Sequence, residues 1–398
     1  MNIVILTTKF STDPLSPWLT NELAETLNGD DHNVQVLCLD WAASNGRGTF
    51  VVNGVTVHNY PAISLNYLPG SLAKLIKWVV SSFLAHHYFI TFVGKNKFDV
   101  MVAFSPCIAV WYCLLKLKKI TTKSVVVYWD FFPIHNYEIG KIRKKFLMKP
   151  AFLIEKYLLS KFNSVGCMSE MNVSFFKNYF LLGSVVKVFE LPVWGRRSLH
   201  ADEDGTVSAL RVRCEYEKLA VFGGQLEHGR GIDTLLRLAK DLKTRNADIA
   251  LVIAGDGPLK SLVIEAEQDG LHNLIYLGQL PRDKYVEFIR TCDIGIVSTQ
   301  TNVSVPTYPS KCVDYLLAPL PIIAIVEAST DFGRIIQDSG CGLLCGSDRV
   351  DELASMIIQL AADDLLREKM RHACINFFDQ RHDVANVAKK LLNELIIS

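Results

Sequence analysis

A glycine-rich connection in the second half of the sequence has the composition of a phosphate-binding loop. An apolar run from 219 leads into Gly223 and Gly224, and a helical pattern begins near Gly231. Glycines let the backbone approach a ligand closely, and the free N–H groups of a helix start attract phosphate oxygens. Arg230 stands at the mouth of this helix and can add a bidentate contact. Because many α/β connections contain two glycines, the loop by itself only favours a phosphate site.

A second candidate site lies at Pro309-Ser310-Lys311, where proline and serine are typical of the first positions of a helix. Lys311 is therefore expected beside a bound anion. Asp314 follows one turn later on the same helix face. A carboxylate does not suit phosphate, but it suits paired hydroxyls such as those of a ribose. An ion pair between Lys311 and Asp314 on a surface helix explains the same residues without a ligand.

The elements that position these residues alternate between strand and helix along both halves of the chain. Apolar runs from 251, 275 and 292 each end at a Gly, Ser or Pro break that precedes a helical pattern. This alternation is typical of a parallel α/β sheet, and such sheets bind ligands at the carboxyl ends of their strands. A length of 398 residues favours two domains. The stretch 192–205 is the predicted linker, which gives domains 1–195 and 196–398.

The charge is distributed unevenly between the two halves. Residues 1–200 contain 21 Lys and Arg against 12 Asp and Glu, whereas residues 201–398 contain 21 against 29. A basic first half suggests an anionic partner, either phospholipid or nucleic acid; docking of the two halves on each other is the simpler alternative. Nucleic acid is poorly supported, because the basic cluster lacks interleaved aromatic side chains and a matching fold.

Residues 78–94 are the one candidate membrane element. The apolar run includes His86 and His87 and is shorter than the roughly 20 residues that a spanning helix needs. We expect a helix that is partly core and partly at the membrane interface. A basic cluster mixed with apolar residues suits an anionic bilayer at ~1 kcal/mol per cation, although an ordinary solvated helix face remains an alternative. The cluster comprises Lys141, Arg143, Lys144, Lys145 and Lys149.

Cysteine usage and the amino terminus indicate the compartment. The ten cysteines are scattered through apolar runs with no Cys-x-x-Cys pair, which predicts reduced, buried thiols in a cytoplasmic protein and no metal site. The first residues form a strand pattern and lack the basic and small-residue features of a signal peptide. A nicotinamide dehydrogenase is disfavoured, because no Gly-x-Gly-x-x-Gly follows the first strand.

The motifs of the second half occur in a recognisable order and spacing. They are Gly-Gly-Gln-Leu-x-x-Gly-Arg-Gly-Ile-Asp-Thr-Leu-Leu, Ile-Ala-Gly-Asp-Gly-Pro, Leu-Gly-Gln-Leu and Pro-Ser-Lys-x-x-Asp-Tyr-Leu-x-x-x-x-Pro-Ile-Ile-Ala. This series resembles the GT-B retaining glycosyltransferases of the "group 1" family, in particular those that build bacterial surface polysaccharides such as O-antigen and capsule. The resemblance covers roughly 218–345 and, more weakly, the first half.

The resemblance implies two Rossmann-like domains facing an interdomain cleft. The first would hold the acceptor and the second a nucleotide-diphosphate sugar, with a last helix that can cross back to the first domain. Asp314 takes the place of the family glutamate on the ribose, and Arg230 that of the basic residue on the diphosphate. The resemblance implies that further donor-binding positions are Gly223, Gly224, Gln225 (where the family often has arginine), Leu280 (near the nucleobase), Ser310 and Lys311.

The sequence departs from the family pattern at three places, one of which is the expected Gly-Gly after the first strand: residues 9–17 contain no glycine, which, like Pro306, favours a non-catalytic scaffold. The earlier of two family glutamates spaced seven residues apart is Pro306 here, so the loop 301–308 is expected to contact the transferred sugar instead. In the first half, Trp129 replaces a family histidine, whereas Asp130 is retained. Asp130 is the predicted acceptor-side residue that positions or deprotonates the hydroxyl, with loop capping as its alternative role. His135 is a second candidate base.

These observations predict a cytoplasmic enzyme, peripheral to the inner membrane, that extends a lipid-linked saccharide with retention of configuration. Preorganised donors act where charge develops in the transition state, so Arg230 and Lys311 are expected to stabilise the departing diphosphate without a metal or other cofactor. Two alternatives remain open. One is a degenerate, non-catalytic scaffold of the same fold, favoured by Pro306; the other is a GT-B sugar-nucleotide epimerase, which would need no lipid surface.

Overall fold

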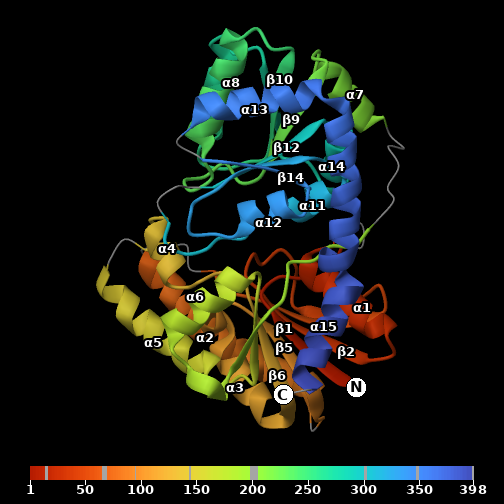
Figure 1. The fold of residues 1–398 in the computed structure, drawn as a ribbon. Coiled ribbons are helices and arrows are strands. Elements are labelled where there is room, and N and C mark those ends of the chain that lie inside the picture. Colours follow the sequence, from red (N-terminus) through yellow and green to blue (C-terminus); the bar gives the residue numbers. More distant parts are fainter. Residues whose placement is uncertain are drawn as a thin grey trace. The chain divides into compact units, whose positions relative to one another are not determined.

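The computed structural model describes residues 1–13, 17–64, 70–94, 96–142, 145–197, 205–299, 303–346 and 349–396. The chain divides into two compact units (Figure 1). Unit 1 comprises Met1–Pro192 together with Val384–Ser398, and unit 2 comprises Val193–Asp383. The boundary at 192/193 lies slightly before the predicted one at 195/196, and the last helix belongs to unit 1.

The described part of unit 1 forms one eight-stranded sheet in the order β3-β4-β2-β1-β5-β6-β7-β8. Only the β3–β4 pair is antiparallel; its turn uses Asn53 and Gly54, both with positive φ, as a tight two-residue hairpin requires. The strands are β1 (Asn2–Thr7), β2 (Asn33–Asp40), β3 (Gly48–Val52), β4 (Val55–Pro61), β5 (Phe98–Phe104), β6 (Thr121–Tyr128), β7 (Ser164–Cys167) and β8 (Lys187–Glu190).

Helices cover both faces of this sheet, which explains why its central strands are almost continuously apolar. The helices are α1 (Leu19–Gly29), α2 (Gly70–Val93), α3 (Trp111–Leu117), α4 (Ile134–Glu138), α5 (Met148–Leu159), α6 (Glu170–Phe180) and α15 (Val384–Ile396), with short 3₁₀ turns η1 (Cys107–Val110), η2 (Lys118–Ile120), η3 (Lys145–Leu147) and η4 (Gly183–Val185). Figure 1 shows α1 and α15 on one face and α2, α3, α5 and α6 on the other. Among the described helices, none combines the length and apolarity needed to cross a bilayer.

Helix α15 is tied to unit 1 by packing and by charge. Its apolar face, including Val387, Leu391 and Leu395, is buried, and it packs beside α1. Lys187 of β8 lies 2.9 Å from the carboxylate of Glu394. The chain therefore leaves unit 1, forms unit 2 and returns to complete unit 1.

A fully buried carboxylate fastens α5 to the 3₁₀ turn η1, which follows β5. Glu155 of α5 is 0% exposed, and its two oxygens accept the backbone N–H groups of Cys107 at 2.8 Å and Ile108 at 3.0 Å. Burial raises the pKa of Glu155 to about 7, against a smaller lowering by these two hydrogen bonds. The carboxylate thus satisfies the orphan N–H groups at the start of η1.

The described part of unit 2 is a six-stranded parallel sheet in the order β11-β10-β9-β12-β13-β14. From β9 the chain builds outward through β10 and β11, then crosses to β12 on the other side, so the strand order reverses between β9 and β12. Loops at such a reversal form the ligand crevice of parallel sheets. The strands are β9 (Lys218–Gly223), β10 (Ile249–Ala254), β11 (Leu274–Gly278), β12 (Ile294–Ser298), β13 (Ile322–Ile325) and β14 (Gly342–Cys345).

The helices of unit 2 also lie on both faces of their sheet. Helix α8 is strongly amphipathic, and its buried face, including Leu235, Leu238 and Leu242, joins β9 and β10 in one core. The helices are α7 (Thr206–Arg213), α8 (Ile232–Thr244), α9 (Lys260–Gln268), α10 (Arg282–Ile289), α11 (Lys311–Leu317), α12 (Phe332–Asp338), α13 (Val350–Ala362) and α14 (Asp364–Phe377), followed by the π-helical turn η5 (Phe378–His382).

Candidate active site

Gly223, predicted to let the backbone approach a ligand, also makes room for a side chain. A Cβ at this position would lie 1.9 Å from the Tyr285 hydroxyl oxygen. Tyr285 belongs to α10 and is buried. The absence of a Cβ therefore lets α10 approach the end of β9. The sequence offered no sign of this contact, because Tyr285 lies far from Gly223 along the chain.

Gly231 performs a similar role where α8 begins. It precedes Ile232 with φ +62, and a Cβ would lie 2.1 Å from Ser298 Oγ at the end of β12. Ser298 is 4% exposed, and its hydroxyl has no hydrogen-bond partner among the described residues. The start of α8 is thus held against β12, at the reversal of strand order, with one unsatisfied hydroxyl beneath it.

The loop after β9 is also pressed against the loop after β10. Gly224 N–H donates to the Ala254 carbonyl at 3.0 Å, and a Cβ at Gly255 would lie 1.8 Å from the Gly224 carbonyl oxygen. Gln225, between these contacts, is exposed. The Gly-Asp-Gly motif noted in the sequence therefore positions the first loop, a role that the motif alone did not disclose.

Arg230 lies at the start of α8 as predicted, and it is half-buried. Its side chain forms no hydrogen bond or ion pair with any described residue. A half-buried guanidinium without a carboxylate partner leaves its charge and its donors available to an anion.

Lys311 and Asp314 form the ion pair that the sequence left open as an alternative. Lys311 Nζ lies 3.2 Å from Asp314 Oδ2 and 4.7 Å from the centre of the Tyr285 ring. Arg282, at the start of α10, places its guanidinium 3.5 Å from Asp314 Oδ1. Asp314 is only 6% exposed, so the pair is not an ordinary surface pair. Sequence reasoning missed Arg282, because it comes from a different helix.

The hydroxyl of Tyr315, on α11, contacts the backbone of both β9 and β12. The Gly223 N–H donates to Tyr315 Oη at 3.0 Å, and this hydroxyl lies 3.1 Å from the Val221 carbonyl and 3.2 Å from the Ile296 carbonyl. Burial raises the pKa of Tyr315 well above its usual range, so the hydroxyl remains neutral. Through Tyr315, α11 is joined to the ends of β9 and β12.

The remaining predicted donor residues flank these loops. Ser310 immediately precedes α11 and is exposed, and its side chain forms no cap on the helix. Leu280 is half-buried in the connection between β11 and α10. The structure therefore brings the β9–α8 loop, α10 and α11 to one edge of the sheet, with Leu280 in the connection that leads into α10.

In unit 1, Asp130 follows β6 and is exposed. The backbone N–H groups of Trp129 and Asp130 donate to Ser105 Oγ at 3.0 and 3.2 Å. The Asp130 carboxylate itself forms no hydrogen bond or ion pair with a described residue. His135, the second candidate base, lies on α4 and is half-buried.

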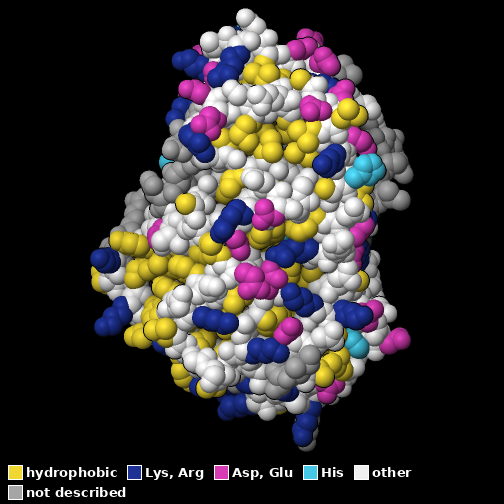
Figure 2. Space-filling model, viewed as in Figure 1, with side chains coloured by type: hydrophobic (Ala, Val, Ile, Leu, Met, Phe, Trp, Pro, Cys, Tyr) yellow, Lys and Arg dark blue, Asp and Glu magenta, His cyan; other side chains and the backbone are white. Residues whose placement is uncertain are grey.

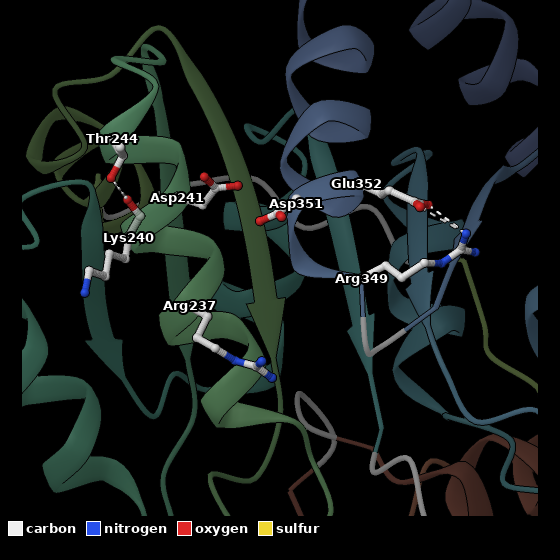
Figure 3. A pocket seen from close by; sticks show the side chains of 7 residues that line it. All are labelled: Arg237, Lys240, Asp241, Thr244, Arg349, Asp351 and Glu352. Carbon is white, nitrogen blue, oxygen red and sulfur yellow. Dashed lines mark hydrogen bonds and ion pairs between the residues drawn. The ribbon is translucent and has the colours of Figure 1, made fainter.

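A separate polar pocket lies on unit 2, and none of the predicted site residues lines it (Figure 3). Its lining side chains come from α8 and the start of α13 and include the ion pair of Arg349 with Glu352. Its charged side chains are three cations, Arg237, Lys240 and Arg349, and three carboxylates, Asp241, Asp351 and Glu352. Within the described ranges, no three His, Cys, Asp or Glu side chains are grouped as metal ligands.

The loops of unit 2 just described lie in a segment that is similar to one sequence family. Residues 212–377 match the family model "Glycosyl transferases group 1". This segment lies inside unit 2 and contains every predicted donor-binding residue. The motif-based resemblance to group 1 glycosyltransferases is therefore supported for this part of the chain.

Two curated relatives match shorter segments. The "Probable glycosyltransferase WbjE" of Pseudomonas aeruginosa is 29% identical over 145 residues, which is 36% of either chain. The "Chitobiosyldiphosphodolichol beta-mannosyltransferase" of Candida albicans (strain SC5314 / ATCC MYA-2876) is 24% identical over 140 residues, which is 34% of this chain and 30% of the relative. The aligned segments span about a third of the length of these relatives.

Similarity of structure extends over the whole chain. A sucrose-phosphate synthase from Thermosynechococcus elongatus gives a TM-score of 0.76 at 14% identity, covering 100% of both chains. HepE of Anabaena, solved in complex with UDP, gives 0.66 at 15% identity, also covering 100% of both. At these identities the likeness concerns the fold. The chain has the two-domain α/β architecture of the GT-B fold, as the motifs predicted.

Proposed function

We propose that the protein is a retaining glycosyltransferase that moves a sugar from a nucleoside-diphosphate sugar to a hydroxyl of a lipid-linked saccharide. The observation that carries this proposal is Arg230, a half-buried guanidinium without a described partner, at the start of α8 inside the matched segment. A diphosphate is the anion that this helix start and this side chain suit best. The complex of HepE with UDP supports the same class of ligand.

The reaction separates charge, and the proposed roles follow from that. As the glycosidic bond to the diphosphate breaks, the leaving oxygens gain negative charge while the anomeric carbon becomes cationic. Arg230 and Lys311 would stabilise the leaving group by preorganised electrostatics. We expect turnover without a metal or other cofactor, because these cations supply the required charge.

Asp314 would bind the ribose hydroxyls of the donor. In the described structure its carboxylate is occupied by Lys311 and Arg282. When a nucleotide binds, Lys311 would turn to the phosphates, and Asp314 would accept the hydroxyls while Arg282 keeps its charge balanced. Release of the leaving phosphate on the face of the incoming hydroxyl would retain the anomeric configuration, with Asp130 positioning the acceptor.

The lipid-linked acceptor is supported by the surface of unit 1 and by one relative. The Candida relative's name specifies a saccharide on diphosphodolichol as its acceptor. Figure 2 shows hydrophobic side chains mixed with Lys and Arg on the side of unit 1 that holds α5. The exposed apolar residues of η3, α5 and α2 include Phe146, Leu147, Leu153, Ile154, Tyr157, Val79, Phe83 and Ile90. Apolar and basic groups together bind anionic bilayers.

This surface supports attachment to the cytoplasmic side of the inner membrane. Lys141, Lys145 and Lys149 of the predicted basic cluster are exposed, whereas Arg143 and Lys144 lie outside the described residues. Assembly of a bacterial surface polysaccharide, such as O-antigen or capsule, follows from the motif resemblance and is proposed on that basis.

A thermal-shift screen tests the function directly. Purified protein is heated with a panel of nucleoside diphosphates and their sugars, with a chelator present in place of metal. A ligand that binds the folded state raises the unfolding temperature, so one nucleotide class should stabilise the wild type by a few degrees and fail to stabilise Arg230→Ala. No response to any nucleotide would favour the non-catalytic scaffold.

A further inference from the structure

The loop between β12 and α11 contains no acidic residue of its own. No Asp or Glu occurs between Ser298 and Asp314, and Pro306 stands where the resemblance places the first glutamate. Yet this loop leads directly into Lys311 and Asp314 and lies at the reversal of strand order. Any carboxylate that supports this loop must therefore come from another segment of the chain.

Glu327, in the turn after the next strand, supplies a carboxylate to this loop. It follows β13 and is 3% exposed. Its Oε1 accepts the Thr307 backbone N–H at 3.2 Å and also the Thr307 hydroxyl, and its Oε2 accepts the hydroxyl of Thr299. Both oxygens are used, so the two ends of the loop are tied to one buried group.

The turn that holds Glu327 adds two further ties. Ser329 Oγ donates to the Val303 carbonyl at 2.7 Å, and Thr330 Oγ1 donates to the Thr307 carbonyl at 2.5 Å. The side chains of Val305 and Pro306 point inward and are buried. Within the described part of the loop, residues 303–308, Ser304 is the exposed residue, and hydrogen bonds from the turn that holds Glu327 fix the backbone at Val303 and Thr307.

We propose that Glu327 is a positioning residue for the transferred sugar, an inference that rests on the proposed function. It holds residues 303–307 in the arrangement that contacts the hydroxyls of the glycosyl group. A site held by buried, fully bonded supports keeps the geometry that recognition requires. The nucleotide is held elsewhere, by Arg230, Lys311 and Asp314, so the two parts of the donor depend on different residues.

This separation defines the experiment. Calorimetry measures the dissociation constants of the nucleoside diphosphate and of its sugar for wild type, Glu327→Gln and Thr307→Val. We expect affinity for the sugar nucleotide to fall about tenfold in Glu327→Gln, with the loss of charged hydrogen bonds, and affinity for the free diphosphate to stay within about twofold. Thr307→Val removes a single hydroxyl, so its affinity for the sugar nucleotide should fall less, again with little change for the free diphosphate. This variant replaces Glu327→Gln in the test if Glu327→Gln does not fold.

Glu155→Gln is the matched control, since it also alters a buried, doubly bonded carboxylate but lies in unit 1. Its ratio of the two dissociation constants should equal that of wild type. An equal loss of affinity for both ligands in the Glu327 and Thr307 variants would overturn the positioning role while leaving the donor site in place. Unchanged affinity for both ligands would do the same. Failure of wild type to bind any nucleotide would instead overturn the proposed function, and this inference with it.

Discussion

Arg230 and Asp314 illustrate two ways in which a charged residue is prepared for a ligand. The Arg230 guanidinium has no described partner, so its charge is available at once. The Asp314 carboxylate is buried between Lys311 and Arg282, so a ligand must replace one of these cations or share it. The first arrangement favours rapid capture of an anion, and the second makes binding depend on an exchange of partners.

Removal of either cation should therefore affect catalysis more than folding. We expect Arg230→Ala and Lys311→Ala to lower turnover by roughly 10²–10³-fold, as loss of a transition-state donor does. Arg230→Ala should leave the unfolding free energy within about 0.5 kcal/mol, as for surface substitutions. Steady-state kinetics and thermal melts check both. Wild-type rates in the two variants would remove them from the diphosphate site.

Asp314→Ala should weaken nucleotide binding in particular. Loss of hydrogen bonds to a charged group costs about 1.5–3 kcal/mol, so the dissociation constant of the nucleoside diphosphate should rise by at least about tenfold. Asp338→Asn, at the exposed end of α12, is the control. An unchanged affinity measured by calorimetry would place the ribose away from Asp314.

At the scale of elements, two neighbouring glycines differ in the space available for a side chain. Gly223→Ala forces a Cβ to within 1.9 Å of the Tyr285 hydroxyl, whereas at Gly224 the nearest atom, of the Phe222 ring, lies 3.4 Å away. We expect Gly223→Ala to lower the unfolding free energy by about 1–3 kcal/mol, as overpacking does, and Gly224→Ala to change it little. Denaturant melts of the pair decide the matter, and equal stabilities would mean that α10 moves aside freely.

Titration of Glu155, on α5, should make the unfolding free energy depend on pH. The pKa of Glu155 is about 7 in the folded chain against an ordinary 4.5, so the native state binds the extra proton between these values. Its stabilising contribution is complete below about pH 4.5 and is lost as pH rises through 7, at up to about 1.4 kcal/mol per pH unit. Denaturant melts from pH 5 to 8 should show this slope in wild type and a shallower one in Glu155→Gln. Parallel curves would show that the carboxylate does not titrate there.

Local sequence patterns predicted the helices and strands but not the side-chain contacts between them. The starts of α8 and α11 were predictable because glycine, proline and serine mark helix ends in the local sequence, and the Lys311–Asp314 pair follows from helix periodicity. Arg282 at Asp314, Tyr285 over Gly223 and Glu327 beneath Thr307 join segments that are distant in sequence. Burial and packing decide such contacts, and no local spacing encodes them.

At the scale of the whole molecule, the basic first half corresponds to unit 1, with its exposed apolar residues on α2 and α5. Lys141, Arg143, Lys144 and Lys145 changed together to Glu should release the protein from anionic vesicles, because each cation contributes about 1 kcal/mol. Lys240→Glu, on the exposed face of α8 in unit 2, should have no such effect. Vesicle sedimentation measures both, and persistent binding of the fourfold variant would locate the membrane contact elsewhere.

The return of α15 to unit 1 has a consequence for how the protein is made. A ribosome delivers all of unit 2 before it delivers the helix that covers β6, β7 and the flank of α1. Domains usually fold in the order of synthesis, but here the first unit waits with an uncovered apolar face until the second has emerged. Unit 1 can therefore complete its native packing only after Val384–Ile396 has followed unit 2 from the ribosome.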